Sequence, residues 1–249
     1  MFSKSTIKYI QSLQHKKFRD EYNVFVAEGP KVVTELLQSN IFSCKAVYAL
    51  KDWYDGLDQN TASLVQARYD VIKDFELEKI AQYATANQVV AVFGKKPAKE
   101  KFTLKNKLTL LLDDIQDPGN MGTIIRTANW FGIENIICSN NSVDVYNPKV
   151  VQSTMASLGR VNIVYTDLQL WIKDAGGIPT FAATLNGRPL HEIGSLKEGM
   201  IIIGNESKGV SAELISLADE EISIPGSGGA ESLNAAIAAG IILYGMIFK

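Results

Sequence analysis

The sequence contains few of the residues that build metal centres and disulfide frameworks. Of its 249 residues only two are cysteines, Cys44 and Cys138, and only two are histidines, His15 and His191. The cysteines lie far apart and match neither a disulfide framework nor a zinc-ligand spacing. We therefore predict no metal site and expect a reducing cytoplasm as the compartment.

Long apolar runs are also missing. The first residues contain no apolar segment of the kind that a signal peptide needs. The longest apolar tract, residues 235–248, is shorter than the roughly 20 residues that span a bilayer. We therefore interpret this tract as a buried helix.

The net charge of −2 alone argues against a nucleic-acid binder, but its distribution is uneven. The first 107 residues carry 17 Lys and Arg against 12 Asp and Glu, whereas the remaining residues carry 8 against 15. Such an asymmetry favours a basic half that meets a polyanion, with chance unevenness as the alternative.

The densest run of charge, residues 95–107, has six lysines, one glutamate and a proline, and it lacks apolar periodicity. We interpret it as a linker between a domain at 1–94 and a domain at 108–249. A solvated connector without a partner explains the lysines as well as an RNA contact does.

Alternating patterns in the first domain predict a small α/β sandwich. Its predicted strands are 22–27, 44–50 and 89–93, and its predicted helices are 5–13, 31–38, 59–67 and 74–82. The second domain has more continuous apolar runs, which are typical of buried parallel strands. The predicted strands are 108–112, 133–138, 161–165, 178–183, 200–204 and 221–224, with helices at 120–131, 148–158, 167–175, 212–217 and 233–248.

Three polar patches follow predicted strands of the second domain, where open α/β sheets build ligand sites. They are Asn120-x-Gly-x-x-x-Arg126-Thr127, the Gly204-Asn205-Glu206 turn, and the glycine-rich loop from Ile224 that ends in Ser232-Leu233-Asn234. An arginine early in a helix, beside exposed backbone N–H groups, suits a phosphate.

Each patch has a simpler explanation when it is taken alone. Asn120 or Asn234 can cap a helix, Glu206 can be a surface carboxylate, and the glycine loop can be a flexible connection. No Walker loop is present, and Gly119-Asn-Met-Gly122 does not complete a dinucleotide-binding fingerprint. The three patches together, at three strand ends of one sheet, are much more informative.

In their order and spacing, the three motifs resemble the SpoU (TrmH-type) family of RNA ribose methyltransferases of the SPOUT superfamily. The match runs from about residue 108 to the C-terminus. The segments 10–19 and 25–31 also resemble that family's L30e-like substrate-binding domain, although less specifically. The overall pattern is most similar to members that act on large-subunit ribosomal RNA.

The resemblance implies a parallel sheet tied in a deep trefoil knot, a homodimer, and S-adenosylmethionine as cofactor. The positions that match the family's catalytic residues are Asn120, Arg126, Glu206, Ser232 and Asn234. The positions implied for cofactor binding are Thr184, Leu185, Gly204, Asn205, Ile224 and Leu233. For RNA binding, we expect contributions from Lys16, Lys17, Arg19, Lys31 and Arg126.

The implied reaction is attack of a ribose 2′-oxygen on the methyl group of the cofactor. In this scheme Arg126 holds a phosphate and stabilises the developing alkoxide, because a guanidinium stays protonated at ordinary pH. The alternatives are a transfer RNA substrate, a non-catalytic RNA-binding or ribosome-assembly factor, and a nucleotide-dependent enzyme acting on small molecules. The complete five-residue set argues against the second, and the absent fingerprint argues against the third.

Overall fold

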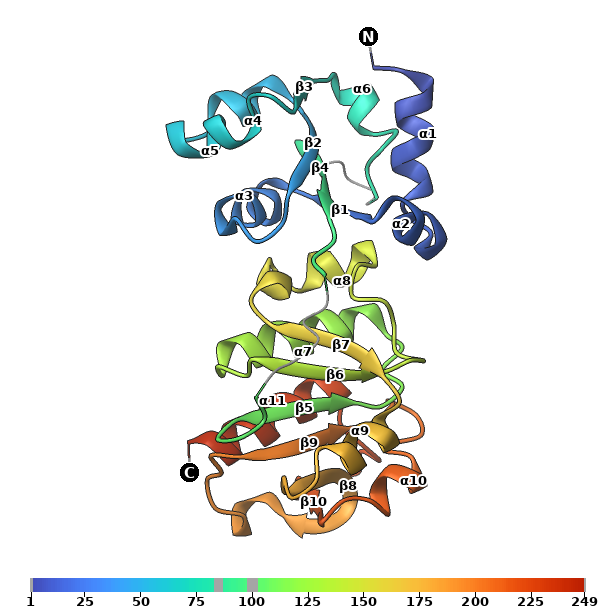
Figure 1. The fold of residues 1–249 in the computed structure, drawn as a ribbon, viewed down its shortest axis with the longest axis vertical. Coiled ribbons are helices and arrows are strands. Elements are labelled where there is room, and N and C mark those ends of the chain that lie inside the picture. Colours follow the sequence, from blue (N-terminus) through green and yellow to red (C-terminus); the bar gives the residue numbers. More distant parts are fainter. Residues whose placement is uncertain (1, 83–86, 98–102, 249) are drawn as a thin grey trace. The chain divides into compact units, whose positions relative to one another are not determined.

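We describe the protein from a computed structural model, which covers residues 2–82, 87–97 and 103–248 (Figure 1). The chain divides into two compact units. Unit 1 contains residues 1–97 together with 144–159, and unit 2 contains 98–143 together with 160–249. Residues 144–159 therefore pack with unit 1, although the sequence-based boundary assigned them to the domain that begins at residue 108. Part of the predicted 95–107 linker lies outside the described residues.

Unit 1 is built around a four-stranded sheet in the order β1-β4-β2-β3, in which only β2 and β3 are parallel. The strands are β1 (Val24–Glu28), β2 (Cys44–Ala49), β3 (Tyr69–Val71) and β4 (Val89–Gly94). The helices are α1 (Lys4–Ser12), α2 (Lys16–Tyr22), α3 (Pro30–Ser39), α4 (Lys51–Asp55), α5 (Gln59–Val65), α6 (Asp74–Leu77), α8 (Pro148–Ser153) and the short η1 (Ser157–Gly159). This mixed α/β arrangement agrees with the prediction.

The two faces of this sheet are covered by different helices. Apolar side chains from α1, including Ile10 and Leu13, pack with Val24 and Val26 on one face. On the other face α3 packs against β1 and β4, and α5 packs against β2. The sequence analysis predicted neither α2 nor α4, because both are short and carry no apolar period.

Unit 2 contains a six-stranded, entirely parallel sheet in the order β10-β8-β9-β5-β6-β7. The strands are β5 (Leu108–Leu112), β6 (Asn135–Ser139), β7 (Asn162–Thr166), β8 (Thr180–Pro189), β9 (Gly199–Ile203) and β10 (Glu220–Ser223). The helices are α7 (Pro118–Trp130), α9 (Leu168–Asp174), the short η2 (Leu190–Glu192), α10 (Ala212–Ile215) and α11 (Ala235–Ile247). The predicted parallel sheet is confirmed.

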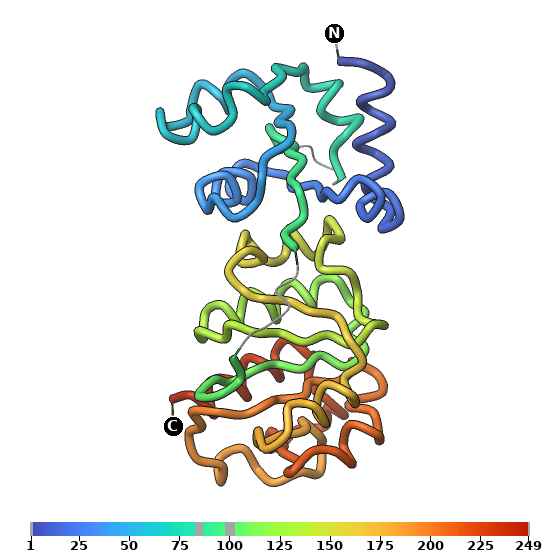
Figure 2. The backbone as a smooth tube through the Cα atoms, in the orientation of Figure 1, coloured from blue at the N-terminus to red at the C-terminus, as the bar shows by residue number. Residues whose placement is uncertain are grey.

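Helices cover both faces of this sheet, which explains why its strands read as continuous apolar runs. Leu168 and Ile172 of α9 pack on one face with Leu111, Ile137 and Ile202. On the other face α11 packs against α7 and β9, and both figures place α7 and α11 behind the sheet and α9 in front of it (Figures 1 and 2). Gly132 follows α7 with a φ of 74°, the left-handed conformation expected after a helix end.

The longest strand, β8, is irregular where it runs beside β10. Between successive β10 residues Glu221 and Ile222, the pairing on β8 moves from Ala182 to Arg188. Residues 183–187 are therefore left out of this pairing and bulge from the strand. The prediction ended the strand at residue 183, so Thr184 and Leu185 lie within β8 rather than after it.

Within the described parts of the chain, none of the helices is both long and apolar enough to cross a membrane.

Candidate active site at the strand ends of unit 2

The first motif opens helix α7 just beyond the carboxyl end of β5. Asp117 is the N-cap, and its side chain accepts a hydrogen bond of 2.8 Å from the backbone N–H of Asn120. Pro118 occupies the first turn, where its missing N–H costs nothing. This cap fixes the start of α7 and thereby the side chain of Asn120, which is 9% exposed.

Asn120 links the second and third motifs through its side-chain amide. Its Nδ2 donates to Oε1 of Glu206 at 2.7 Å, and its Oδ1 accepts from Nδ2 of Asn234 at 2.8 Å. A carboxylate only accepts hydrogen bonds, so Glu206 must face the NH₂ group of Asn120. The carbonyl oxygen of Asn120 is thereby turned toward Asn234. The structure therefore brings together three residues that the sequence analysis had chosen from separate motifs.

Asn234 has a second role as the N-cap of α11. Its Oδ1 accepts from the backbone N–H groups of Ala236 and Ile237 at 3.0 and 3.3 Å. The helix thus begins at Ala235, two residues later than predicted, and Ser232 and Leu233 lie in the exposed loop before it. Asn234 therefore caps α11 and hydrogen-bonds to Asn120 at the same time.

Glu206 and Asn205 occupy a tight turn after β9. The backbones of Asn205 and Gly209 exchange two hydrogen bonds, and a Cβ atom at Gly204 would overlap Gly209 and Val210, so only glycine fits there. The Asn205 side chain accepts from the N–H groups of Ser207 and Lys208 and donates to the Asp114 carbonyl at 2.8 Å. Asn205 therefore shapes the turn that presents Glu206.

Arg126 lies on α7 about 9 Å further along the axis from Asn120. Its side chain is exposed, and the structure gives its guanidinium no hydrogen bond or ion pair with the described residues. An exposed guanidinium without a partner among the described residues, on the same helix as Asn120, can bind an anion.

The positions predicted for cofactor binding lie on three adjacent strands, β10, β8 and β9, or in the turn and loop that follow them. Thr184 and Leu185 are in the β8 bulge, Gly204 follows β9, and Ile224 follows β10. Leu185 is 72% exposed, and Leu233, in the loop from Ile224 to Asn234, is 45% exposed. The Oγ1 atom of Thr184 is buried without a hydrogen-bond partner among residues 2–82, 87–97 and 103–248. Exposed apolar carbon beside an unsatisfied hydroxyl is suited to a ligand with both polar and apolar parts.

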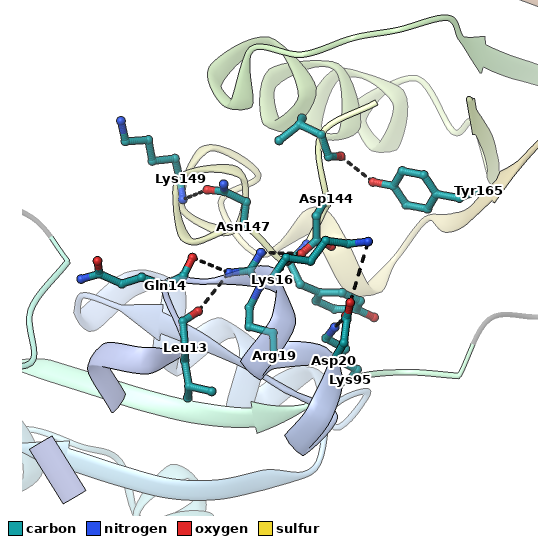
Figure 3. Close-up of polar contacts among 12 residues, drawn as sticks. Leu13, Gln14, Lys16, Arg19, Asp20, Lys95, Asp144, Asn147, Lys149 and Tyr165 are labelled. Carbon is teal, nitrogen blue, oxygen red and sulfur yellow. Dashed lines mark hydrogen bonds and ion pairs between the residues drawn. The ribbon is translucent and has the colours of Figure 1, made fainter. Parts of the chain in front are cut away.

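The predicted role of Arg19 in RNA binding is wrong in this structure. Its side chain is 2% exposed and lies in unit 1 (Figure 3). It donates to Oδ2 of Asp144 at 2.6 and 3.1 Å and to the carbonyls of Leu13 and Gln14 at 3.0 and 2.7 Å. These bonds use four of the five N–H donors of the guanidinium, and burial keeps the fifth from a phosphate in solution. The other predicted RNA-binding residues of unit 1, Lys16, Lys17 and Lys31, are exposed.

Exchanging Asn120 for aspartate tests the network. The Asn120→Asp variant places a second carboxylate within hydrogen-bond distance of Glu206, so we expect it to lower the free energy of unfolding by about 1–3 kcal/mol. The Asn120→Asp/Glu206→Gln double variant restores a donor opposite an acceptor and should recover most of that loss. Urea denaturation of the three proteins measures this, and a double variant no more stable than Asn120→Asp would contradict the network.

Comparison with known proteins assigns each part of the chain to a known domain family. Residues 107–244 match the model of the SpoU rRNA Methylase family, and residues 4–91 match the MRM3-like substrate binding domain. The chain is 31% identical over 241 residues to the 23S rRNA (guanosine(2553)-2′-O)-methyltransferase RlmP of Bacillus subtilis, covering 96% of this chain and 94% of that protein.

Solved structures give the same result. The AdoMet-bound rRNA methyltransferase from Sinorhizobium meliloti superposes with a TM-score of 0.85 at 29% identity, covering 99% of this chain and 95% of that one. The SpoU methyltransferase AviRb from Streptomyces viridochromogenes, at 24% identity and a TM-score of 0.83, shares the fold. By the family match and the near full-length relative, this chain belongs to the SpoU rRNA methylase family.

Proposed function

We propose that this protein transfers the methyl group of S-adenosylmethionine to a ribose 2′-hydroxyl of large-subunit ribosomal RNA. The observation that carries the proposal is the Asn120–Glu206–Asn234 network, which joins the three motifs, together with the exposed guanidinium of Arg126 on the same helix as Asn120. The B. subtilis relative that matches almost the whole chain is named as an enzyme of this type. A non-catalytic RNA-binding factor would have no need of this arrangement.

The residues present fit the cofactor. The unsatisfied hydroxyl of Thr184 supplies a polar contact, and the exposed carbon of Leu185 and Leu233 supplies apolar cover. Gly204 and Ile224 would contribute backbone groups. Asn205 would act through the turn it builds, because its side chain and backbone are already hydrogen-bonded. When bound, the cofactor supplies an activated methyl group on a sulfonium centre.

The side chains of the protein position the nucleophile and control its charge. Arg126 binds a phosphate next to the target ribose, and its positive charge stabilises the oxyanion that develops at the 2′-oxygen. Glu206 orients the amide of Asn120, and Asn120 in turn holds Asn234 in place. Ser232, exposed in the loop before α11, contacts the ribose or its phosphate. A 2′-hydroxyl as acceptor restricts the substrate to RNA.

Transfer of a labelled methyl group from S-adenosylmethionine to purified ribosomal RNA, transfer RNA and DNA tests the proposal. We expect label in ribosomal RNA and in 2′-O-methyl nucleosides after digestion. Label confined to transfer RNA would move the substrate to the alternative class. If calorimetry detects no heat of cofactor binding and the RNA stays unlabelled, the alternative of a non-catalytic RNA-binding protein would be correct.

The proposal includes the remaining features implied by the family: a trefoil knot in unit 2, a homodimer and a cytoplasmic location. The homodimer is supported by one face of α11 that stays exposed, although the sequence analysis treated this helix as buried. Spacings of four, three and four residues place its exposed apolar side chains on that face: Ile237, Ile241, Tyr244 and Phe248. Trp130 at the end of α7, which packs against α11, is 83% exposed.

A second copy is the occupant that best matches this surface. Helix α11 contains no charged residue, so two copies can meet face to face without burying a charge. Soluble proteins rarely expose a large contiguous apolar patch, and such a patch marks an interaction surface.

We expect Tyr244→Glu to convert the dimer to a monomer, because it places a carboxylate in the apolar contact. Leu170→Glu is the matched control, since Leu170 is 59% exposed against 62% for Tyr244 and lies on α9 at the opposite face of the sheet. Sedimentation velocity at several concentrations measures the change, with circular dichroism to verify folding. Dimers that survive Tyr244→Glu would use another surface, and a monomeric wild type would remove the dimer from the proposal.

A further inference from the structure

Four aromatic rings lie next to one another on helices α1 and α2 of unit 1 and on the residue that precedes α2. The ring centroids of Tyr9 and Tyr22 are 5.2 Å apart, those of Phe18 and Tyr22 are 6.4 Å apart, and those of His15 and Phe18 are 6.4 Å apart. The rings of Phe18 and Tyr22 are inclined by only 14° and so present nearly parallel faces. We call Tyr9, His15, Phe18 and Tyr22 the ring platform.

The ring platform is anchored on its inner side and open on its outer side. Tyr9 and Phe18 are half-buried against the apolar core beneath α1, whereas Tyr22 is 46% exposed and His15 is exposed. Burial, and secondarily the neighbouring Tyr22, raises the pKa of Tyr9, so its phenol stays neutral. The packing therefore holds the rings of Tyr9 and Phe18 in place, with little freedom left to lose on binding.

Exposed lysines lie on the same two helices as the ring platform. Lys4 and Lys8 are on α1, and Lys16 and Lys17 begin α2, with the ammonium of Lys17 placed 5.8 Å from the Phe18 ring centroid. The carboxylate of Asp20 on the same helix is paired with Lys95 at 2.5 Å (Figure 3). The exposed surface of α1 and α2 is therefore basic, with Glu21 as the exposed carboxylate outside such a pair.

We propose that the ring platform stacks an unpaired base of the RNA substrate while the exposed lysines of α1 and α2 contact the adjoining phosphates. The inference rests on the proposed function for the identity of the partner as RNA. Interleaved aromatic and basic side chains bind single-stranded nucleic acid, because every base offers a flat face and every linkage a negative charge. In a duplex the faces of the bases are already stacked, so a ring platform favours unpaired nucleotides.

Binding of oligonucleotides by the full-length protein tests this inference. The probes are a 12-nucleotide single-stranded RNA that contains 2-aminopurine and a blunt duplex of the same sequence. We expect the wild type to bind the single strand more tightly and to quench its fluorescence by stacking. Tyr22→Leu should weaken single-strand binding on the order of tenfold and remove the quenching, whereas Tyr22→Phe should preserve both.

Tyr54→Leu is the matched control. Tyr54 stacks on Tyr69 in β3, at the opposite edge of the sheet from β1, the strand that α2 contacts. The Tyr54→Leu variant should bind the single-stranded RNA within about twofold of the wild type, as expected for a change outside the proposed RNA contact. Lys17→Gln should weaken binding to single strand and duplex alike and reduce the salt dependence.

Three outcomes would overturn the inference: unchanged single-strand affinity in Tyr22→Leu, an equal loss on single strand and duplex, or loss of binding in Tyr22→Phe. The methyl-transfer assay distinguishes this failure from failure of the proposed function. A wild type that methylates RNA while Tyr22→Leu binds normally refutes only the ring platform. Binding that depends on Tyr22 without methyl transfer to any RNA refutes only the enzymatic function.

Discussion

Replacing Arg126 with alanine is expected to reduce methyl transfer by at least about 10²- to 10³-fold while cofactor affinity stays within about twofold. The side chain is exposed on α7, without an ion pair among the described residues, so its removal should leave the fold unchanged. The positive charge of Arg126 acts on the 2′-oxygen of the ribose. The negative charge on that oxygen develops only as the reaction proceeds, so the loss of Arg126 should slow methyl transfer without weakening cofactor binding. Single-turnover methyl transfer together with calorimetry of cofactor binding separates the two effects.

Two further variants make this test specific. Arg126→Lys keeps the charge but loses the planar fork, so we expect an intermediate rate. Arg160→Ala removes an exposed arginine from the same unit and should have no effect on turnover. Turnover of Arg126→Ala within a few-fold of the wild type would show the assignment to be wrong. A parallel loss of cofactor affinity would instead assign Arg126 to the cofactor.

Replacing Arg19 with alanine is expected to lower the free energy of unfolding by about 3–5 kcal/mol. The change leaves the carboxylate of Asp144, which is 11% exposed, and the carbonyls of Leu13 and Gln14 without their donor. A buried charge without its partner is costly because water cannot replace the lost contact. Urea denaturation followed by circular dichroism measures the loss.

Lys16→Ala provides the control from the same helix. Lys16 is 68% exposed and lies 3.8 Å from Asp20, so its loss should change stability by less than about 1 kcal/mol. In RNA binding the order should be reversed. Lys16→Ala should weaken binding more than Arg19→Ala does, because only Lys16 is accessible to a phosphate. A stable Arg19→Ala protein that binds RNA poorly would restore the original prediction for Arg19 and contradict the buried ion pair.

Local pattern was sufficient to predict most of unit 2. The runs at 108–112 and 200–204 predicted β5 and β9 to within one residue, because strands buried on both faces must be apolar throughout. Asn120 and Arg126 could be found because a capped helix after a buried strand is visible in the sequence. The resemblance to a known family then selected Glu206 and Asn234.

The two faces of α11 could not be distinguished from the sequence. The helix is apolar on all sides, so periodicity cannot show which side chains meet the sheet and which remain exposed. The structure buries Ala239, Ile242 and Leu243 and leaves Ile237 and Tyr244 exposed. Only the packing of α11 against α7 and β9 decides this difference.

The sequence by itself determined the parallel sheet and the three motifs, because strand burial and helix capping depend on neighbours within a few residues. The resemblance to a known family singled out the candidate site residues within those motifs. The tertiary structure alone decided which of those residues meet. Glu206 and Asn234 reach Asn120 across 86 and 114 residues, and Asp144 reaches Arg19 across 125. Whether a polar side chain joins a hydrogen-bond network or is buried in a core depends on such distant partners. The residues next to it in the sequence do not reveal which of the two occurs.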